Sequence, residues 1–141
     1  ILERARGHVR ADGERLMLDW SEARALHASR LIAIGAHTVN HPILSRLPAA
    51  EMESEIRDSK AALENGLQAP VSHFAYPNGR PGDYTPETIG LLARYGFKSA
   101  VTTIHGVNRP GTSRFEWLRR QPWEADSDSF AFRFLAERLR G

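Results

Sequence analysis

The stretch Gly35-Ala36-His37-Thr38-Val39-Asn40-His41-Pro42 places two histidines directly after the apolar run Leu31-Ile32-Ala33-Ile34. The apolar run predicts a buried strand over residues 31–36. If the chain turns helical after His37, both rings point to one spot, because residues i and i+4 of a helix share a face. Two neutral imidazoles at one spot form half of a zinc site, and the other ligands must come from elsewhere.

Size and composition fit an ordinary globular domain. The chain has 141 residues and a formal net charge of only +2. Residues 1–141 are therefore expected to form a single domain, without the strong field that binding to nucleic acid needs. The absence of cysteine excludes thiolate metal sites and disulfides. No apolar run approaches the roughly 20 residues of a membrane span. Neither the cellular location nor the oligomeric state follows from these features.

Helical and strand patterns alternate along the chain. Helices are expected near 19–29, 48–66, 85–95 and 127–139, and strands at 31–36, 71–76, 97–103 and 115–119. This order is typical of an α/β domain with a parallel sheet. The apolar stripes expected to face the core are Met52, Ile56, Leu63 and Leu67; Ile89, Leu92 and Ala93; and Phe130, Phe134, Leu135 and Leu139.

Helix ends are marked by local signals. Asp19 is expected to cap the first helix, with Glu22 completing a capping box. Thr85 is expected to cap another helix, with Pro86 at its first helical position. Asn65-Gly66 is expected to end the helix that starts near Pro48.

The ends of three predicted strands carry polar or turn-forming residues. These segments are 37–41, 76–82 and 102–105. Because the carboxyl ends of parallel strands meet at one edge of a sheet, we expect them to share a site. The turn Pro77-Asn78-Gly79 could present backbone N–H groups to a substrate, or it could be an ordinary surface turn. The two histidines could bind a metal, or they could be hydrogen-bonded loop residues.

Three of these segments together resemble a known family. Residues 34–42 look like the His-Ser/Thr-x-x-His motif of polysaccharide deacetylases (carbohydrate esterase family four, the NodB homology domain). Phe74-Ala75-Tyr76-Pro77-Asn78-Gly79 resembles the third motif of that family, and residues 95–103 resemble its following helix–strand step. The likeness spans about residues 18–120. It implies a partial, distorted (β/α) barrel and the hydrolysis of N-acetyl or O-acetyl groups on a glycan.

The resemblance also assigns roles to residues. His37 and His41 match the two metal-ligating histidines, and the implied cofactor is a divalent cation, first of all Zn²⁺. Thr38 matches the hydroxyl that steadies the metal-site loop, and we also expect it to contact the substrate. The implied partner is an acetylated glycan.

The third motif implies the parts that face the acetyl group. The backbone N–H of Asn78 matches the position that helps to hold the oxyanion. Tyr76 and Pro77 would form the wall of the substrate groove beside it.

The chain departs from the family pattern at the catalytic base. The family's Asp-Asp pair, which supplies the base and a third metal ligand, occurs nowhere in the sequence. The arginine that orients the base falls at Ala75, although Arg80 could substitute, and His105 is too early to match the general acid. Since the first residue is Ile1 and not Met, we expect the chain to be the carboxy-terminal part of a deacetylase domain. Alone, it is expected to be inactive and poorly soluble.

Two alternatives stay open at this point. One is a non-catalytic carbohydrate-binding or structural relative that lacks the base. The other is an unrelated α/β domain with a chance pair of histidines.

Overall fold

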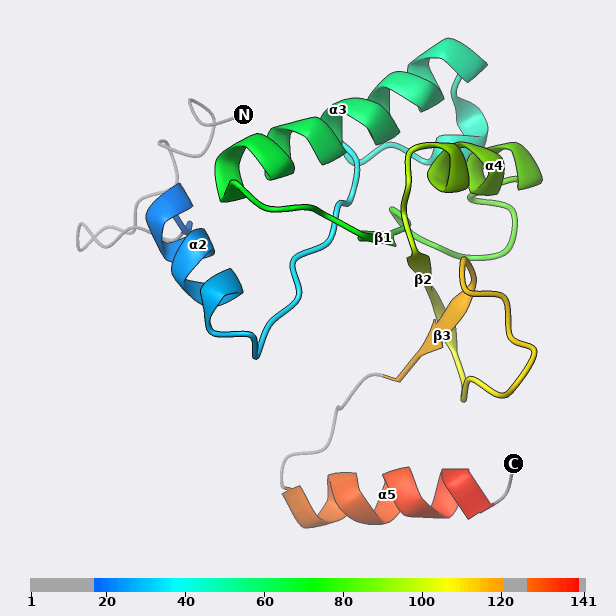
Figure 1. Ribbon diagram of the computed structural model, residues 1–141. Coiled ribbons are helices and arrows are strands. Elements are labelled where there is room, and N and C mark those ends of the chain that lie inside the picture. The colour runs from blue at the N-terminus through cyan, green and yellow to red at the C-terminus, as the bar shows by residue number, and fades with distance from the viewer. Residues whose placement is uncertain (1–16, 121–126, 140–141) are drawn as a thin grey trace, which may run out of the picture.

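The computed structural model describes residues 17–120 and 127–139 (Figure 1). Helices and strands alternate over residues 49–105, as the sequence predicts. The elements, in chain order, are α2 (Trp20–Ala28), η1 (Leu44–Arg46), α3 (Ala49–Leu67), β1 (His73–Ala75), α4 (Pro86–Arg94), β2 (Ser99–His105), β3 (Trp117–Arg119) and α5 (Ser127–Leu139).

The three strands form a parallel sheet in the order β1-β2-β3. His73 pairs with Ser99 in the first register and Val101 pairs with Trp117 in the second. Helix α3 contacts α2 and α4 and runs along one side of this sheet (Figure 1). The arrangement is the expected partial α/β barrel, and the carboxyl ends of its strands lie at one edge.

The predicted strand over residues 31–36 is wrong for most of its length. Ala36 alone forms an isolated parallel bridge, to Phe74, through hydrogen bonds of 2.8 Å to His73 and Ala75. Leu31 is 90% exposed and Ile32 is 47% exposed. Within the described residues no neighbouring strand runs beside 31–35, so these apolar residues have no ladder to join. The bridge at Ala36 still places His37 at the end of β1.

The helix starts follow the sequence signals. The Asp19 carboxylate accepts from the Glu22 N–H at 2.9 Å, and the Glu22 carboxylate accepts from the Asp19 N–H at 2.9 Å. Thr85 and Thr88 form the same reciprocal pair at the start of α4, where Pro86 is the first helical residue. Both capping predictions are confirmed. They were possible because each cap depends on residues only three positions apart.

The predicted end of α3 is displaced. The helix ends at Leu67, and Gln68 takes the left-handed conformation with φ 56°. Gly66 lies inside the helix, where a Cβ would be 2.3–2.4 Å from ring atoms of Trp20. Gly66 therefore allows the indole of α2 to approach α3, and it does not terminate the helix.

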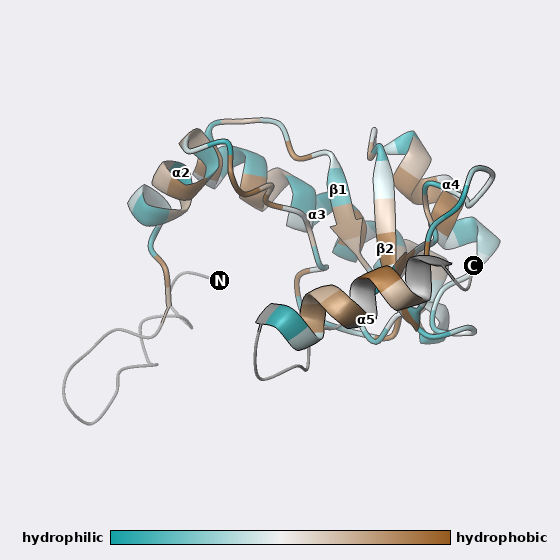
Figure 2. Ribbon diagram, turned by 90° about the horizontal axis from the view of Figure 1, so that it is seen from below, coloured by the Kyte–Doolittle hydropathy of each residue, from teal (hydrophilic) through white to brown (hydrophobic). Residues whose placement is uncertain are grey.

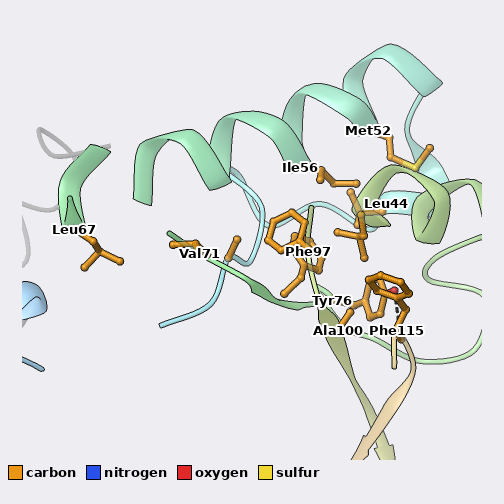
Figure 3. Close-up of a cluster of buried hydrophobic side chains, with 12 residues drawn as sticks. Leu44, Met52, Ile56, Leu67, Val71, Tyr76, Phe97, Ala100 and Phe115 are labelled. Atoms are coloured by element: carbon orange, nitrogen blue, oxygen red, sulfur yellow. Dashed lines mark hydrogen bonds between the residues drawn. The ribbon is translucent and has the colours of Figure 1, made fainter. Parts of the chain in front are cut away.

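The hydrophobic core lies between α3, α4 and the sheet (Figure 3). Met52, Ile56 and Leu67 of the predicted α3 stripe are buried, and Leu63 packs against the core from its edge. The remaining core residues are Ala36, Leu44, Val71, Phe74, Tyr76, Leu92, Phe97, Ala100 and Phe115.

Two predicted core faces need correction. On α4, Ala93 is exposed and Thr88 is fully buried, because the helix turns its Thr88–Leu92 face to the core. On α5, Phe130 is 40% exposed and Leu135 is 56% exposed. The ribbon of this helix carries hydrophobic stretches, drawn brown in Figure 2. Among the described residues, the core cluster takes none from α5. The side chains of Phe134 and Leu139 lie outside the described part.

No helix in the described ranges is both long enough and apolar enough to cross a lipid bilayer.

Candidate metal centre and oxyanion turn

His37 and His41 lie against each other. Their ring centres are 4.7 Å apart and their planes are inclined by 75°. The chain does not turn helical after His37, which was the condition for the i, i+4 spacing to bring the rings together, since Thr38 and His41 adopt left-handed conformations with φ of 63° and 58°. A tight turn and not a helix face therefore brings the rings together.

The ring of His37 is oriented by the neighbouring strand. Its Nδ1 lies 2.7 Å from the carbonyl oxygen of Ala75, at the end of β1. Because a carbonyl oxygen only accepts, Nδ1 carries a hydrogen, and in the neutral imidazole the lone pair is then on Nε2. This is the arrangement in which a histidine ligates a metal while its other nitrogen is fixed by a hydrogen bond.

Thr38 closes the turn between the two histidines. Its hydroxyl donates to the His37 carbonyl at 2.5 Å and accepts from the His41 N–H at 3.0 Å. The Thr38 side chain thus links the backbone of both histidines, in keeping with the steadying role expected for it.

Glu55 of α3 binds the middle of the same loop. One carboxylate oxygen accepts from the N–H groups of Val39 and Asn40 at 2.7 and 2.9 Å, and the other accepts from the Asn40 side-chain amide at 2.6 Å. Burial by itself raises the pKa of Glu55, but the hydrogen bonds from Asn40 and Val39 outweigh it and hold the pKa below its ordinary value. Glu55 is therefore an ionised anchor for the loop.

Open space borders the histidine loop on one side. A cavity of about 750 Å³ is lined by His37, Thr38 and Val39 on one wall and by Trp20 and Leu63 among the residues of α2 and α3. Both imidazoles are exposed. A ligand can therefore reach the pair.

The turn after β1 has an unusual backbone. Asn78 and Gly79 have φ of 60° and 67°, and the Gly79 N–H donates to the Pro77 carbonyl at 2.7 Å. A Cβ on Gly79 would lie 2.9 Å from the Thr103 nitrogen, so only glycine fits against β2. Thr103 donates its N–H to Gly79 and its hydroxyl to the Asn78 carbonyl. Asn78 is exposed, and in residues 17–120 and 127–139 no acceptor is assigned to its N–H.

Tyr76 and Pro77 support this turn from inside. Tyr76 is 2% exposed, donates its hydroxyl to the Phe115 carbonyl at 2.8 Å and stacks on Tyr84 with ring centres 4.1 Å apart. Burial raises the pKa of Tyr76 far above its ordinary value, so its hydroxyl stays protonated as a donor. Pro77 is also buried. Contact of these two side chains with a substrate stays a prediction, whereas their burial next to the turn is observed.

Comparison with known proteins identifies the family of this chain. The family model described as "Polysaccharide deacetylase" matches residues 5–100. The chain belongs to the polysaccharide deacetylase family. YxkH of Bacillus subtilis (strain 168), which carries the name of a polysaccharide deacetylase, is 33% identical to it over 76 residues.

Two solved structures share the fold of this chain. The Streptococcus pyogenes deacetylase PplD, determined in complex with acetate, superposes with a TM-score of 0.68 at 26% identity over 82% of this chain. IcaB from Ammonifex degensii superposes with a TM-score of 0.64 at 28% identity, also over 82%. The chain spans 50% and 51% of these two proteins and 26% of YxkH.

The deacetylase-family chain offers two of the donors that a zinc site needs. Two imidazoles that share a tetrahedral zinc at 2.0–2.1 Å have ring centres about 5 Å apart, close to the arrangement of His37 and His41. Within the described ranges, no group of three His, Cys, Asp or Glu side chains could hold a metal ion. The pair therefore fits a metal as a partial ligand set.

Two other candidate residues of this deacetylase-family chain, His105 and Arg80, make no hydrogen bond to the histidine pair among the described residues. His105 is the last residue of β2 and is exposed, and Arg80 is exposed within the turn-rich segment before α4.

The contact of Glu55 with the histidine loop was not predicted from the sequence. One signal was present, since Glu55 lies next to the buried Ile56 and three positions after the buried Met52, on the edge of the apolar stripe.

Proposed function

We propose that this chain supplies the histidine metal ligands and the oxyanion turn of a metal-dependent enzyme that removes acetyl groups from a polysaccharide. The bond to be hydrolysed is the C–N bond of an N-acetyl group, or the ester bond of an O-acetyl group. The contact of the His37 and His41 rings at 4.7 Å, with His37 already oriented by Ala75, carries the proposal. Family membership and the acetate bound by a structural relative support it.

His37 and His41 would hold the cation through ring nitrogens, with Nε2 as the donor of His37. A bound zinc ion supplies a Lewis acid for the acetyl carbonyl and a more acidic water. Thr38 keeps both histidine backbones in one turn. The loop therefore orients the two imidazoles before a cation binds.

The Asn78 turn would face the acetyl oxygen. Its backbone N–H, to which no acceptor is assigned in the described part of the chain, can donate to the negative charge that develops on that oxygen during attack. Because Gly79 packs on Thr103, the turn is held before substrate arrives, which is the condition for effective charge stabilisation.

The base that takes the proton of water is not assigned within the described residues, where no carboxylate completes a three-residue ligand group with the histidines. A second candidate function is that of a relative that binds or organises carbohydrate without catalysis. The two functions differ in turnover, not in the geometry of the histidine loop.

The test uses the protein produced from the complete reading frame that contains this chain. Acetate release from partly acetylated N-acetylglucosamine oligomers and an O-acetylated glycan would be measured, together with zinc content. The proposed function predicts acetate release that falls at least about 100-fold in His37→Ala and His41→Ala, with loss of zinc.

His105→Ala is the matched control, since it removes an exposed histidine from the end of β2. It should keep zinc content and activity. Glycan binding without acetate release from the unmodified protein would favour the non-catalytic candidate. Full activity of both loop variants would overturn the metal-ligand assignment.

A further inference from the structure

Glu55 accepts three hydrogen bonds from Val39 and Asn40, which lie between the two histidines of the loop. Its carboxylate accepts from the Val39 N–H, the Asn40 N–H and the Asn40 side chain at 2.6–2.9 Å. Val39 and Asn40 are flanked by Thr38 and His41, the two left-handed residues of the loop. One side chain on a helix therefore fixes the segment that sets the direction of the His41 ring relative to His37.

Apart from the hydrogen bonds of Thr38 and Glu55, the loop has few contacts that would keep this shape. His37, Asn40 and His41 are exposed, so packing contributes little to their position. Left-handed backbone is unfavourable for side chains with a Cβ, and most so for the β-branched Thr38. Such a conformation persists only when neighbouring contacts determine it.

The base of the Glu55 side chain is itself rigid. The adjacent Ile56 is fully buried, and Met52 one turn earlier is 3% exposed. A carboxylate on such a helix is a fixed acceptor for charge-assisted hydrogen bonds, which are stronger than neutral ones. The helix core and the histidine loop are thereby coupled through a single residue.

We infer that Glu55 is a positioning residue, which holds loop 38–41 so that the His37 and His41 rings face one cation. The inference rests on the proposed function for the cation, but the ring geometry can be tested without it. Glu55 does not contact the reacting atoms and acts through Val39 and Asn40.

The first experiment measures the loop without metal. Nuclear Overhauser contacts between the two imidazoles, and the Val39 and Asn40 amide signals, would be recorded in the protein from the complete reading frame. Glu55→Ala should lose the ring contact and shift both amides, whereas Glu55→Gln, which keeps an acceptor oxygen, should retain part of it. The matched control is Glu51→Ala, an exposed carboxylate one turn earlier on α3. An unchanged ring contact in Glu55→Ala would overturn the inference.

The second experiment titrates Zn²⁺ into the same proteins. Glu55→Ala is expected to weaken zinc binding by about 10- to 100-fold, with partial rescue in Glu55→Gln. If zinc binding depends on His37 and His41 but not on Glu55, the positioning role is wrong. If the unmodified protein binds no zinc while Glu55→Ala loses the ring contact, the positioning role stands and the proposed metal site fails.

Discussion

The histidine loop and the Asn78 turn lie on adjacent segments of the sheet edge, but different forces hold them. Side-chain hydrogen bonds from Thr38 and Glu55 hold the loop, while its imidazoles stay exposed. The Asn78 turn rests on β2 and on the buried Tyr76. The loop is thus accessible and polar, as a cation site must be, whereas the turn is rigid through packing. The two sides of the site should respond differently to mutation and to pH.

Gly79→Ala should have the largest effect on stability. A Cβ at this position meets the Thr103 nitrogen at 2.9 Å, and the φ of 67° is unfavourable for alanine. We expect a loss of about 2–4 kcal/mol in the free energy of unfolding, measured by urea denaturation. Gly82→Ala is the control, because φ is also positive there but no atom lies within 4 Å of the added Cβ. Equal losses in the two variants would show that close packing on β2 does not hold the turn.

Tyr76→Phe should have the next largest effect. It removes the buried hydroxyl that binds the Phe115 carbonyl at 2.8 Å but keeps the ring that stacks on Tyr84. The expected loss is about 1–2 kcal/mol, since the carbonyl is left without its partner. The ring contact of His37 and His41 should stay unchanged. A loss of that contact would show that the two sides of the site are coupled.

Thr38→Val should cost less, about 1 kcal/mol, because it removes hydrogen bonds from an exposed loop. Thr38→Ser keeps the hydroxyl and should preserve both stability and the ring contact. The effect of valine on the loop amides should exceed its effect on the Gly79 amide. Equal behaviour of serine and valine would show that the hydroxyl does not hold the loop.

Lowering the pH should have the smallest effect on stability. Because the pKa of Glu55 is held below its ordinary value of 4.5 in the folded protein, ionised Glu55 stabilises the fold above that pH. This contribution is lost as the pH falls from 4.5 through the lower folded value. The Val39 and Asn40 amide signals should therefore move in this acid range. The Gly79 amide, which donates to a backbone carbonyl, should not follow the same titration. Parallel titration of all three would contradict a role for Glu55.

Short-range features were predictable from the sequence. The caps at Asp19 and Thr85 depend on residues within a few positions. The order of helices and strands from α2 to β3 also follows from periodicity, apart from residues 31–36. The family resemblance named the two histidines whose rings are found in contact, although their spacing suggested a helix where a left-handed turn is present.

Contacts between distant segments were not predictable. Gly66 was read as a helix end because the sequence does not show Trp20 packed over it. Ala93 was assigned to the core because a short helix leaves its rotation undetermined by some tens of degrees. In the sequence, Glu55 is one of several carboxylates on an amphipathic helix, and only the tertiary structure places the histidine loop beside it.

By itself, the sequence determined where the chain turns, which residues begin its helices, and which two imidazoles are close along the chain. Each of these depends on local backbone preference and hydrogen bonding. Only the tertiary structure decided that Ala75 orients His37, that Glu55 holds residues 39–40, and that Gly79 rests on Thr103. Those contacts join residues far apart in the chain, and their geometry is set when helices and strands pack together.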